Sequence, residues 1–221
     1  MKKRKYFISK IHLSTKRNYF KRMTLNKPEC IKIAKKFGKD FWDGKRKFGY
    51  GGYKYIKNYF KPVAMKLIKE YKLNENSKIL DVGCGKGFLL YEIKKLIPKI
   101  KIYGFDISPY AIRNSKKEIK KSLFVLRAQN KYPFKKNYFD LLLSINTLHN
   151  LELFDLKKSI KEINRVSKRQ YLVVESYRNE KELFNLQCWA LTAQAFFSVK
   201  EWEWILKEYK YKGEYEFIFF S

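Results

Sequence analysis

The sequence predicts an α/β protein with a doubly wound, mostly parallel sheet, preceded by an N-terminal helical arm and lid. From residue 59 onward, short and almost continuously apolar segments alternate with helical patterns, which is typical of parallel strands covered on both faces. A glycine-rich turn follows the first of these strands, and an acidic residue ends the second. Of the 221 residues, 45% are apolar, which is enough for a buried core and excludes a fully disordered chain.

The chain divides into two predicted regions: a basic arm and lid over 1–58, and the α/β domain over 59–221. Residues 1–36 carry 13 basic residues and one acidic residue, and the apolar residues between them predict a partly helical arm. A helix over about 28–37 follows, because Pro28 suits an early helical position.

The stretch 41–53 is rich in glycine and aromatic residues and is predicted to be a loop. Glycine lets the backbone approach a ligand closely, and tyrosine offers both a ring and a hydroxyl group. Tyr50 and Tyr53 are therefore candidate substrate contacts in a lid. The alternative is a structural turn that is packed by its own aromatic side chains.

The regular part of the chain has strands and helices in alternation. Apolar runs and their flanking turn residues set the expected bounds, and Ser198 with Glu201 forms a capping box that opens the last helix. Strands are expected over 78–82, 100–105, 123–126, 139–144, 171–174 and 214–220, and helices over 63–71, 88–97, 109–120, 156–167 and 198–209.

The formal net charge of +29 arises from 50 basic and 21 acidic residues and points to an anionic partner. Lysine supplies 41 of the basic residues and arginine only nine, a bias that A/T-rich codons can produce. Residues 1–75 hold +18 of the excess and residues 76–221 hold +11. The charge is thus explained mainly by codon-driven lysine, with a basic entrance that favours an anionic substrate, and nucleic acid stays the alternative.

The cysteines and the apolar runs indicate the cellular setting. Cys30, Cys84 and Cys188 are widely spaced and form no CxxC pair, so neither a disulfide framework nor a metal site is expected, and a cytoplasmic location fits. No apolar run approaches the ~18 residues of a membrane span. The basic N-terminus lacks the apolar core of a secretory signal.

A strand that runs directly into a glycine-rich turn is the most informative segment. Gly83, Gly85 and Gly87 alternate with other residues between the strand 78–82 and the next predicted helix. Such glycines let the backbone turn tightly and bring a bound molecule to the helix N-terminal amides. Phe88 stands where a dinucleotide fingerprint needs its third glycine, and the sequence of a phosphate-binding P-loop is absent.

Asp106 is predicted to end the second strand, 23 residues after Gly83. A carboxylate at this position accepts hydrogen bonds from both ribose hydroxyl groups of a nucleoside ligand. The alternative is that Asp106 caps the helix that follows. The glycine turn and the acid, found in this order, favour a ligand that contains a nucleoside.

These residues resemble the motifs of the class I S-adenosylmethionine-dependent methyltransferases, a Rossmann-like family, over about residues 60–175. Residues 81–87 match the first motif, D-x-G-x-G-x-G, and Asp106 matches the ribose-binding acid. Residues 132–140 match the run that leads into strand four, and residues 143–150 match the segment that leaves it. The two ends of the chain resemble those of bacterial small-molecule methyltransferases.

The resemblance implies that S-adenosyl-L-methionine is the cofactor and S-adenosyl-L-homocysteine the product. It places Asp106 at the ribose, Ile107 at the adenine ring, and Asn146 beside the transferring methyl group and the acceptor. Where the family often has an acid near the adenine amino group, this chain has Ala128 and Gln129, so an amide of Gln129 or its neighbour would supply the acceptor. The residues expected around the methionine part are Asp81, Gly83, Cys84, Gly85 and Gly87.

Methyl transfer from a sulfonium ion is an in-line displacement, so the protein mainly aligns the nucleophile and manages a proton. An oxygen or protonated-amine acceptor benefits from a general base. His149, just past strand four, and Glu175, which ends strand five, are the rival catalytic candidates. The alternatives are an orienting or surface histidine and a structural acid. Trp189 is a candidate lining residue of the acceptor pocket, or else a core residue.

We therefore expect a methyltransferase that acts on an oxygen or nitrogen atom of a small, anionic or sugar-like metabolite. The alternatives are an RNA methyltransferase that uses the basic arm, and a non-catalytic binding module that has retained the fold. Amino-methyltransferases of DNA, cytosine C5 enzymes and metal-dependent catechol-type enzymes are not indicated, because their characteristic residues are missing. The sequence leaves the oligomeric state open.

Overall fold

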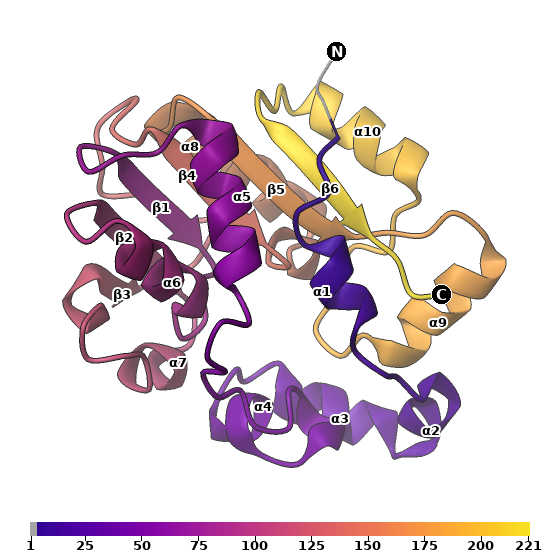
Figure 1. The fold of residues 1–221 in the computed structure, drawn as a ribbon. Coiled ribbons are helices and arrows are strands. Elements are labelled where there is room, and N and C mark those ends of the chain that lie inside the picture. The colour runs from indigo at the N-terminus through magenta and orange to yellow at the C-terminus, as the bar shows by residue number, and fades with distance from the viewer. Residues whose placement is uncertain (1–3) are drawn as a thin grey trace.

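The computed structural model describes residues 4–221, whose strands form one six-stranded, fully parallel sheet (Figure 1). The strand order is β3-β2-β1-β4-β5-β6, and the chain reverses its direction of travel across the sheet between β1 and β4. The fold class predicted from the sequence is confirmed, and the sheet is parallel throughout rather than in most of its strands. The strands are β1 (Lys78–Val82), β2 (Lys101–Asp106), β3 (Leu123–Val125), β4 (Leu141–Ile145), β5 (Gln170–Glu175) and β6 (Glu214–Ile218).

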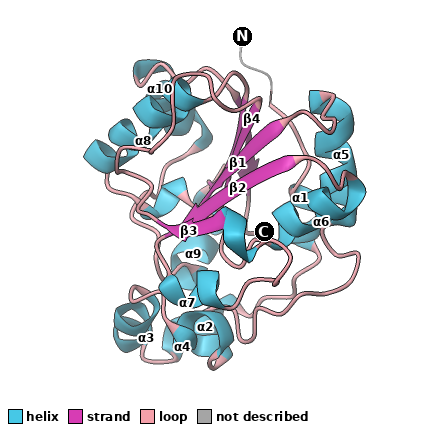
Figure 2. Ribbon diagram, turned by 90° about the vertical axis from the view of Figure 1, so that its left-hand side faces the viewer, coloured by secondary structure: helices cyan, strands magenta, loops and turns pink. Residues whose placement is uncertain are grey.

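Helices cover both faces of the sheet because successive strand residues point to opposite sides. Ile79 faces the helices α5 and α6, whereas its neighbour Leu80 faces α8 and α10. Figure 2 shows these two helical layers on either side of the strands. The helices of the α/β region are α5 (Lys61–Tyr71), α6 (Phe88–Leu96), α7 (Pro109–Arg113), α8 (Leu153–Val166), α9 (Glu180–Trp189) and α10 (Val199–Glu208).

The N-terminal region forms short helices that lie across the carboxyl ends of the strands (Figure 1). Helix α2 lies against α9, at the C-terminal side of the sheet. The predicted loop over 41–53 is wrong in part, because it contains the end of α4 and a 3-10 helix. These elements are α1 (Ser9–Leu13), α2 (Tyr19–Thr24), α3 (Lys27–Ala34), α4 (Lys39–Asp43) and the 3-10 helix η1 (Arg46–Phe48).

A buried carboxylate in β6 fixes the start of the arm. The backbone N–H groups of Phe7, Ile8 and Ser9 all donate to the carboxylate of Glu216, at distances of 2.6 to 3.2 Å. The hydroxyl of Tyr171 donates to the same carboxylate. The N–H groups in the first turn of α1 have no partners inside the helix. The carboxylate accepts hydrogen bonds from them, and its negative charge interacts favourably with the helix dipole.

Several element boundaries differ from the prediction, and one helix was not predicted. The helix that starts at Pro109 ends at Arg113 rather than at 120, because the side chain of Asn114 donates to the carbonyl of Tyr110, 2.8 Å away. Strand β4 starts at Leu141, two residues later than predicted. Helix α9 was not predicted, although Asn179 caps it by accepting from the N–H of Glu182. The predicted capping box of α10 is confirmed.

Candidate active site

The carboxyl ends of four adjacent strands bring polar side chains together at one edge of the sheet. Asp106 is the last residue of β2, and Glu175 is the last residue of β5. Asp81 is the penultimate residue of β1, and Asn146 follows the last residue of β4. Because the sheet is parallel, all four lie at the edge where ligands bind in doubly wound folds, on both sides of the switch point between β1 and β4.

The glycine turn after β1 has a conformation that its glycines make possible. Gly83, Gly85 and Gly87 have φ values of 78°, 56° and 71°, which side-chain-bearing residues adopt at a cost. A Cβ at Gly83 would collide with the side chain of Thr147, and one at Gly85 would lie 2.9 Å from the ring of Trp42. The turn is therefore pressed between the segment after β4 and the N-terminal region.

Asp106 accepts two backbone hydrogen bonds that fix its carboxylate. Gly85 N donates to Oδ2 at 2.9 Å, and Ser108 N donates to Oδ1 at 2.8 Å. Each oxygen keeps a second lone pair, which a ribose hydroxyl can use. The N-cap of α7 is Ser108, which accepts from Ala111 N, so Asp106 is not the helix cap. Burial raises the pKa of Asp106, although these backbone bonds oppose the shift.

Two buried acceptors near the turn have no hydrogen-bond partner within residues 4–221. They are Oδ1 of Asp81 and Oδ1 of Asn146, at the ends of neighbouring strands. Burial, reinforced by the charge of Asp106, raises the pKa of Asp81 to about 7. Unpaired buried acceptors cost about 1–3 kcal/mol each, so a ligand that donates here is favoured. The ammonium group of an amino-acid ligand, which has three N–H donors, fits this pair.

On the predicted adenine side of the site, several polar groups are already hydrogen-bonded within the chain. Ile107 is partly buried, and the carbonyl of Ala128 already accepts from the hydroxyls of Tyr132 and Ser159, both at 2.8 Å. Gln129 donates its amide to Asp155 at 3.1 Å, which turns its carbonyl oxygen away from that acid. The contact of Gln129 with adenine stays a prediction.

His149 and Glu175 form a close pair. His149 Nδ1 accepts from the backbone N–H of Glu175 at 3.3 Å, so the ring proton resides on Nε2, which lies 3.5 Å from the Glu175 carboxylate. Burial lowers the pKa of His149 to about 3 and raises the pKa of Glu175 to about 7. The neutral histidine has its acceptor nitrogen occupied, whereas the carboxylate can take a proton. The geometry therefore favours Glu175 as the base and His149 as a positioning residue.

Aromatic residues of the lid cover the glycine turn. Tyr50 stacks on Trp42 with ring centroids 5.1 Å apart, and Tyr53 stacks on Phe88 at 5.2 Å. Burial, reinforced by the charges of Glu175 and Asp106, raises the pKa of Tyr50 to about 12, although 43% of this residue stays exposed. Tyr50 therefore lies within electrostatic range of the carboxylates of Asp106 and Glu175.

Sequence reasoning missed several residues that shape the site. Trp42 donates its indole N–H to Ser108 at 2.9 Å, and Asp43 pairs with Lys86 inside the glycine turn. Trp189 is half-buried and lies among three arginines, so it is not a core residue. The available signal was the aromatic and glycine-rich stretch around Trp42. The thiol of Cys84 is buried, and burial raises its pKa well above the ordinary value.

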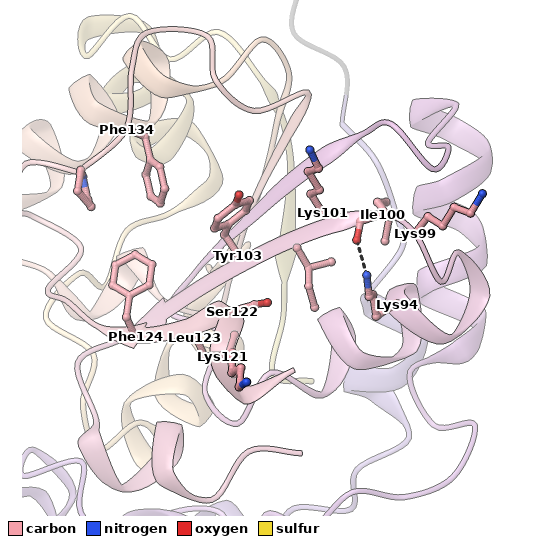
Figure 3. A pocket seen from close by; sticks show the side chains of 12 residues that line it. Lys94, Lys99, Ile100, Lys101, Tyr103, Lys121, Ser122, Leu123, Phe124 and Phe134 are labelled. Carbon is pink, nitrogen blue, oxygen red and sulfur yellow. Dashed lines mark hydrogen bonds between the residues drawn. The ribbon is translucent and has the colours of Figure 1, made fainter. Parts of the chain in front are cut away.

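A groove of about 530 Å³ lies elsewhere, beside the first half of β2, which does not pair with β3 (Figure 3). Tyr103 and Phe124 lie along it, and the lysines Lys94 and Lys101 flank it. It lies toward the amino end of β2, away from Asp106, and includes none of the predicted site residues. In the described part of the chain, no group of three or more metal-binding side chains occurs, and no helix is long and apolar enough to cross a membrane.

The parallel sheet and the glycine turn after β1 are typical of a methyltransferase-type domain. A family model described as a methyltransferase domain matches residues 73–215, and the chain belongs to this family, the class I S-adenosylmethionine-dependent methyltransferases. The chain therefore contains a methyltransferase domain, as the sequence predicts. Family membership implies S-adenosyl-L-methionine as the cofactor, and the unpaired acceptors, the glycine turn and Asp106 fit it.

Similar proteins share the central part of the chain. It is 33% identical over 114 residues to a demethylmenaquinone methyltransferase of Chlorobaculum tepidum, covering 51% of this chain and 46% of that protein. It is 30% identical over 109 residues to the mitochondrial arginine-hydroxylase NDUFAF5 of Mus musculus, covering 49% of this chain and 31% of that protein. The chain thus spans less than half the length of these relatives. The YcgJ protein of Bacillus subtilis has the same fold, with a TM-score of 0.53 at 18% identity over 66% of each chain.

Proposed function

We propose that this enzyme transfers a methyl group from S-adenosyl-L-methionine to an oxygen or nitrogen atom of a small, anionic or sugar-like metabolite. The observation that carries the proposal is the placement of Glu175, a partly exposed carboxylate, at the same sheet edge as Asp81, Asp106 and Asn146. An acceptor that loses a proton during methylation needs a base at this position. The family membership supplies the reaction class.

When bound, the cofactor supplies an electrophilic methyl group on a sulfonium centre. Asp106 would hold the ribose hydroxyls, and Asp81 and Asn146 would accept from the amino-acid end. Glu175 accepts the proton of the attacking oxygen or nitrogen. His149 holds Glu175 from two sides, because its Nδ1 binds the backbone N–H and its Nε2–H faces the carboxylate.

The lid supports this chemistry by covering the turn. Tyr50 and Tyr53 form part of an aromatic layer over the glycine turn, and such a layer limits the access of water to the transferring group. The contact of Tyr50 and Tyr53 with the acceptor is part of the proposal. Trp189, at the end of α9, is proposed to extend this aromatic layer. The guanidinium carbon of Arg46 in the lid lies 4.9 Å from its ring centroid.

A calorimetric titration with S-adenosyl-L-homocysteine tests the proposal. We expect the wild type to bind and Asp106→Asn to lose at least tenfold in affinity, about 1.4 kcal/mol. Asp140→Asn is the matched control, because this carboxylate binds the N–H of Lys78 at the opposite end of β1. No binding by the wild type would support the non-catalytic module instead. Equal affinity for both variants would remove Asp106 from the ribose site.

An RNA acceptor is the second candidate, and the net charge of +29 favours it. It predicts RNA binding in the nanomolar to micromolar range that falls steeply with salt, because bound cations are released from the phosphates. Binding that is weak, and equal for RNA and for other polyanions, would reject this candidate. Small anionic metabolites should then be screened for methyl incorporation.

A further inference from the structure

Three arginines surround one tryptophan beside the candidate active site. The guanidinium carbons of Arg17, Arg22 and Arg46 lie 5.5, 4.7 and 4.9 Å from the ring centroid of Trp189. Arg17 precedes α2, Arg22 lies in α2, Arg46 starts η1, and Trp189 ends α9. Figure 1 shows α2 and α9 side by side, which explains how residues far apart in the sequence converge. We call these four residues the Trp189–arginine cluster.

The positive charges of the cluster have no carboxylate partner within 4 Å in the described residues. Arg17 donates to the carbonyls of His12 and Thr15, and Arg22 donates to the carbonyl of Arg46 at 2.5 Å. Arg22 is only 8% exposed, and its Nε has no hydrogen-bond partner in residues 4–221, as is also true of Nε of Arg17. Buried donors on uncompensated cations are costly unless an anion satisfies them.

The pKa shifts agree with this geometry. Burial, reinforced by the charge of Arg46, lowers the pKa of Arg22 to about 10. Burial also lowers the pKa of Arg17. The charge of Arg46 acts in the same direction, and the charge of Glu175 opposes it. Arg46 therefore repels both Arg17 and Arg22 in a partly desolvated place. An oxyanion that binds there would offset this repulsion and raise the pKa values of the arginines.

The choice of arginine is itself informative. The chain has 41 lysines and nine arginines, yet three of the nine meet at this one indole ring. A guanidinium group stacks flat on an aromatic ring and still offers a fork of N–H donors to a phosphate or carboxylate, which an ammonium group does not. A codon bias toward lysine does not produce this cluster.

The cluster adjoins the residues that the proposed reaction uses. Arg46 donates to the carbonyl of Tyr50 at 3.2 Å, and the charge of Arg46 acts on the hydroxyl of Tyr50. The charge of Glu175 acts on both Arg17 and Tyr50. An acceptor molecule that reaches Glu175 with its nucleophile thus has the arginines within reach of a second, anionic group.

We propose that the Trp189–arginine cluster binds an oxyanion group, phosphate or carboxylate, of the methyl acceptor. The proposal rests on the proposed function, since it assigns the substrate class of the same site. It separates the anion contact from the reacting atom: Glu175 faces the proton, and the arginines hold the charge at the far end of the molecule. The opposing interpretation is a purely structural cluster that fastens α2 and η1 to α9.

Inorganic phosphate and acetate, each added to the full chain at constant ionic strength, are the probes. The nine arginine Nε–Hε groups give a small set of NMR signals, and we expect those of Arg17, Arg22 and Arg46 to shift saturably. The signal of Arg113, an exposed arginine in α7, should not move. A stronger response to phosphate or to acetate identifies the group. Failure of both probes to move the three signals overturns the proposal.

A pair of variants tests the same site by affinity. Arg46 is the exposed member of the cluster, so Arg46→Gln should fold and lose at least tenfold in affinity for the oxyanion. Lys47→Gln removes the same charge from the next position and should leave that affinity unchanged. Equal affinities for both variants and the wild type would show that the cluster is structural. If Arg46→Gln does not fold, the NMR titration of the wild type decides alone.

The two proposals fail separately. Oxyanion binding is measured without a methyl donor, and Arg46→Gln should keep the wild-type affinity for S-adenosyl-L-homocysteine. If S-adenosyl-L-homocysteine does not bind but phosphate does, the methyltransferase proposal falls, and the cluster stands as an oxyanion site without its assignment to a methyl acceptor. If the product binds and neither anion does, the anion site falls alone.

Discussion

The ammonium group of Lys86, inside the glycine-rich turn, lies 2.7 Å from the carboxylate of Asp43 at the end of α4. Lys86 also donates to the carbonyl of Tyr53 at 2.7 Å, and the hydroxyl of Tyr110 donates to Asp43 at 2.8 Å. Burial alone would raise the pKa of Asp43, but hydrogen bonds from Lys86 and Tyr110 hold it below its ordinary value. One ion pair therefore joins the lid to the predicted cofactor turn.

Asp43→Asn should loosen the lid. The substitution leaves Lys86, which is 4% exposed, as a buried charge without its partner, and such a loss costs about 3 kcal/mol in a buried pair. We expect faster proteolytic cleavage within 39–60 and faster release of S-adenosyl-L-homocysteine, measured by limited proteolysis and stopped-flow dissociation. Asp40→Asn, an exposed change in the same helix, is the control. Equal cleavage of the two variants would contradict a clamp role for Asp43.

Glu175→Gln should abolish most of the activity while preserving cofactor binding. The amide keeps the shape of the side chain but accepts no proton, so we expect kcat to fall by about 10²–10⁴-fold. The affinity for S-adenosyl-L-homocysteine should stay within about twofold. A variant with wild-type kcat on a proton-bearing acceptor would show that Glu175 is a structural acid.

His149→Phe should move the pH dependence rather than remove the activity. The pKa of His149 is about 3 and that of Glu175 about 7, so in the wild type kcat should rise with pH through about 7 as Glu175 loses its proton. Without the Nε2–H that faces the carboxylate, the charged form of Glu175 is less favoured. The rising limb should then lie at higher pH. An unchanged profile would reject the positioning role.

The sequence predicted the parts of the site that lie at the carboxyl ends of the strands. Gly83 to Gly87 and Asp106 each sit at the end of an apolar strand, so a periodic pattern and one parallel sheet are enough to locate them. Asn146 and Glu175 follow from the same rule.

The lid and the arginines depend on tertiary contacts that no local pattern contains. Arg22 meets Trp189 only because α2 lies against α9, and α9 itself was not predicted. The abundance of lysine also hid the arginines, since charge counting treats both residues alike. The rarity of arginine in this chain was the signal that separates them.

Asp81→Asn should change how stability depends on pH. Because burial raises the pKa of Asp81 to about 7, the folded protein binds its proton more tightly than the unfolded chain does. Asp81 thus contributes stability that is present below about pH 4 and is lost as the pH rises through about 7, by about 4 kcal/mol in total. The difference in unfolding free energy between wild type and Asp81→Asn should therefore shift in favour of the variant from pH 4 to pH 8. Parallel curves would show that Asp81 is ionised in the folded protein.

Glu216→Gln should release the arm and, through it, the anion site. The carboxylate of Glu216 is fully buried and accepts hydrogen bonds from the N–H groups of Phe7, Ile8 and Ser9. In Glu216→Gln, an amide NH₂ group replaces one of these oxygens and faces a backbone N–H, so two donors meet. We expect a loss of about 3 kcal/mol in unfolding free energy, because buried acceptors for several backbone donors are lost together. Hydrogen exchange at residues 7–13 should speed up.

The arm anchored by Glu216 leads into α2, so its release should also weaken oxyanion binding at the Trp189–arginine cluster. Glu214→Gln is the comparison variant, because this residue lies in the same strand, accepts from the hydroxyl of Tyr71 at 2.5 Å, and contacts the arm through the side chain of Lys5 at 3.3 Å rather than through the arm's backbone. The control should keep slow exchange at residues 7–13 and the wild-type phosphate response. If Glu216→Gln loses stability yet binds phosphate as the wild type does, the cluster is held by α9 alone, and the arm serves only to cover the edge of β6.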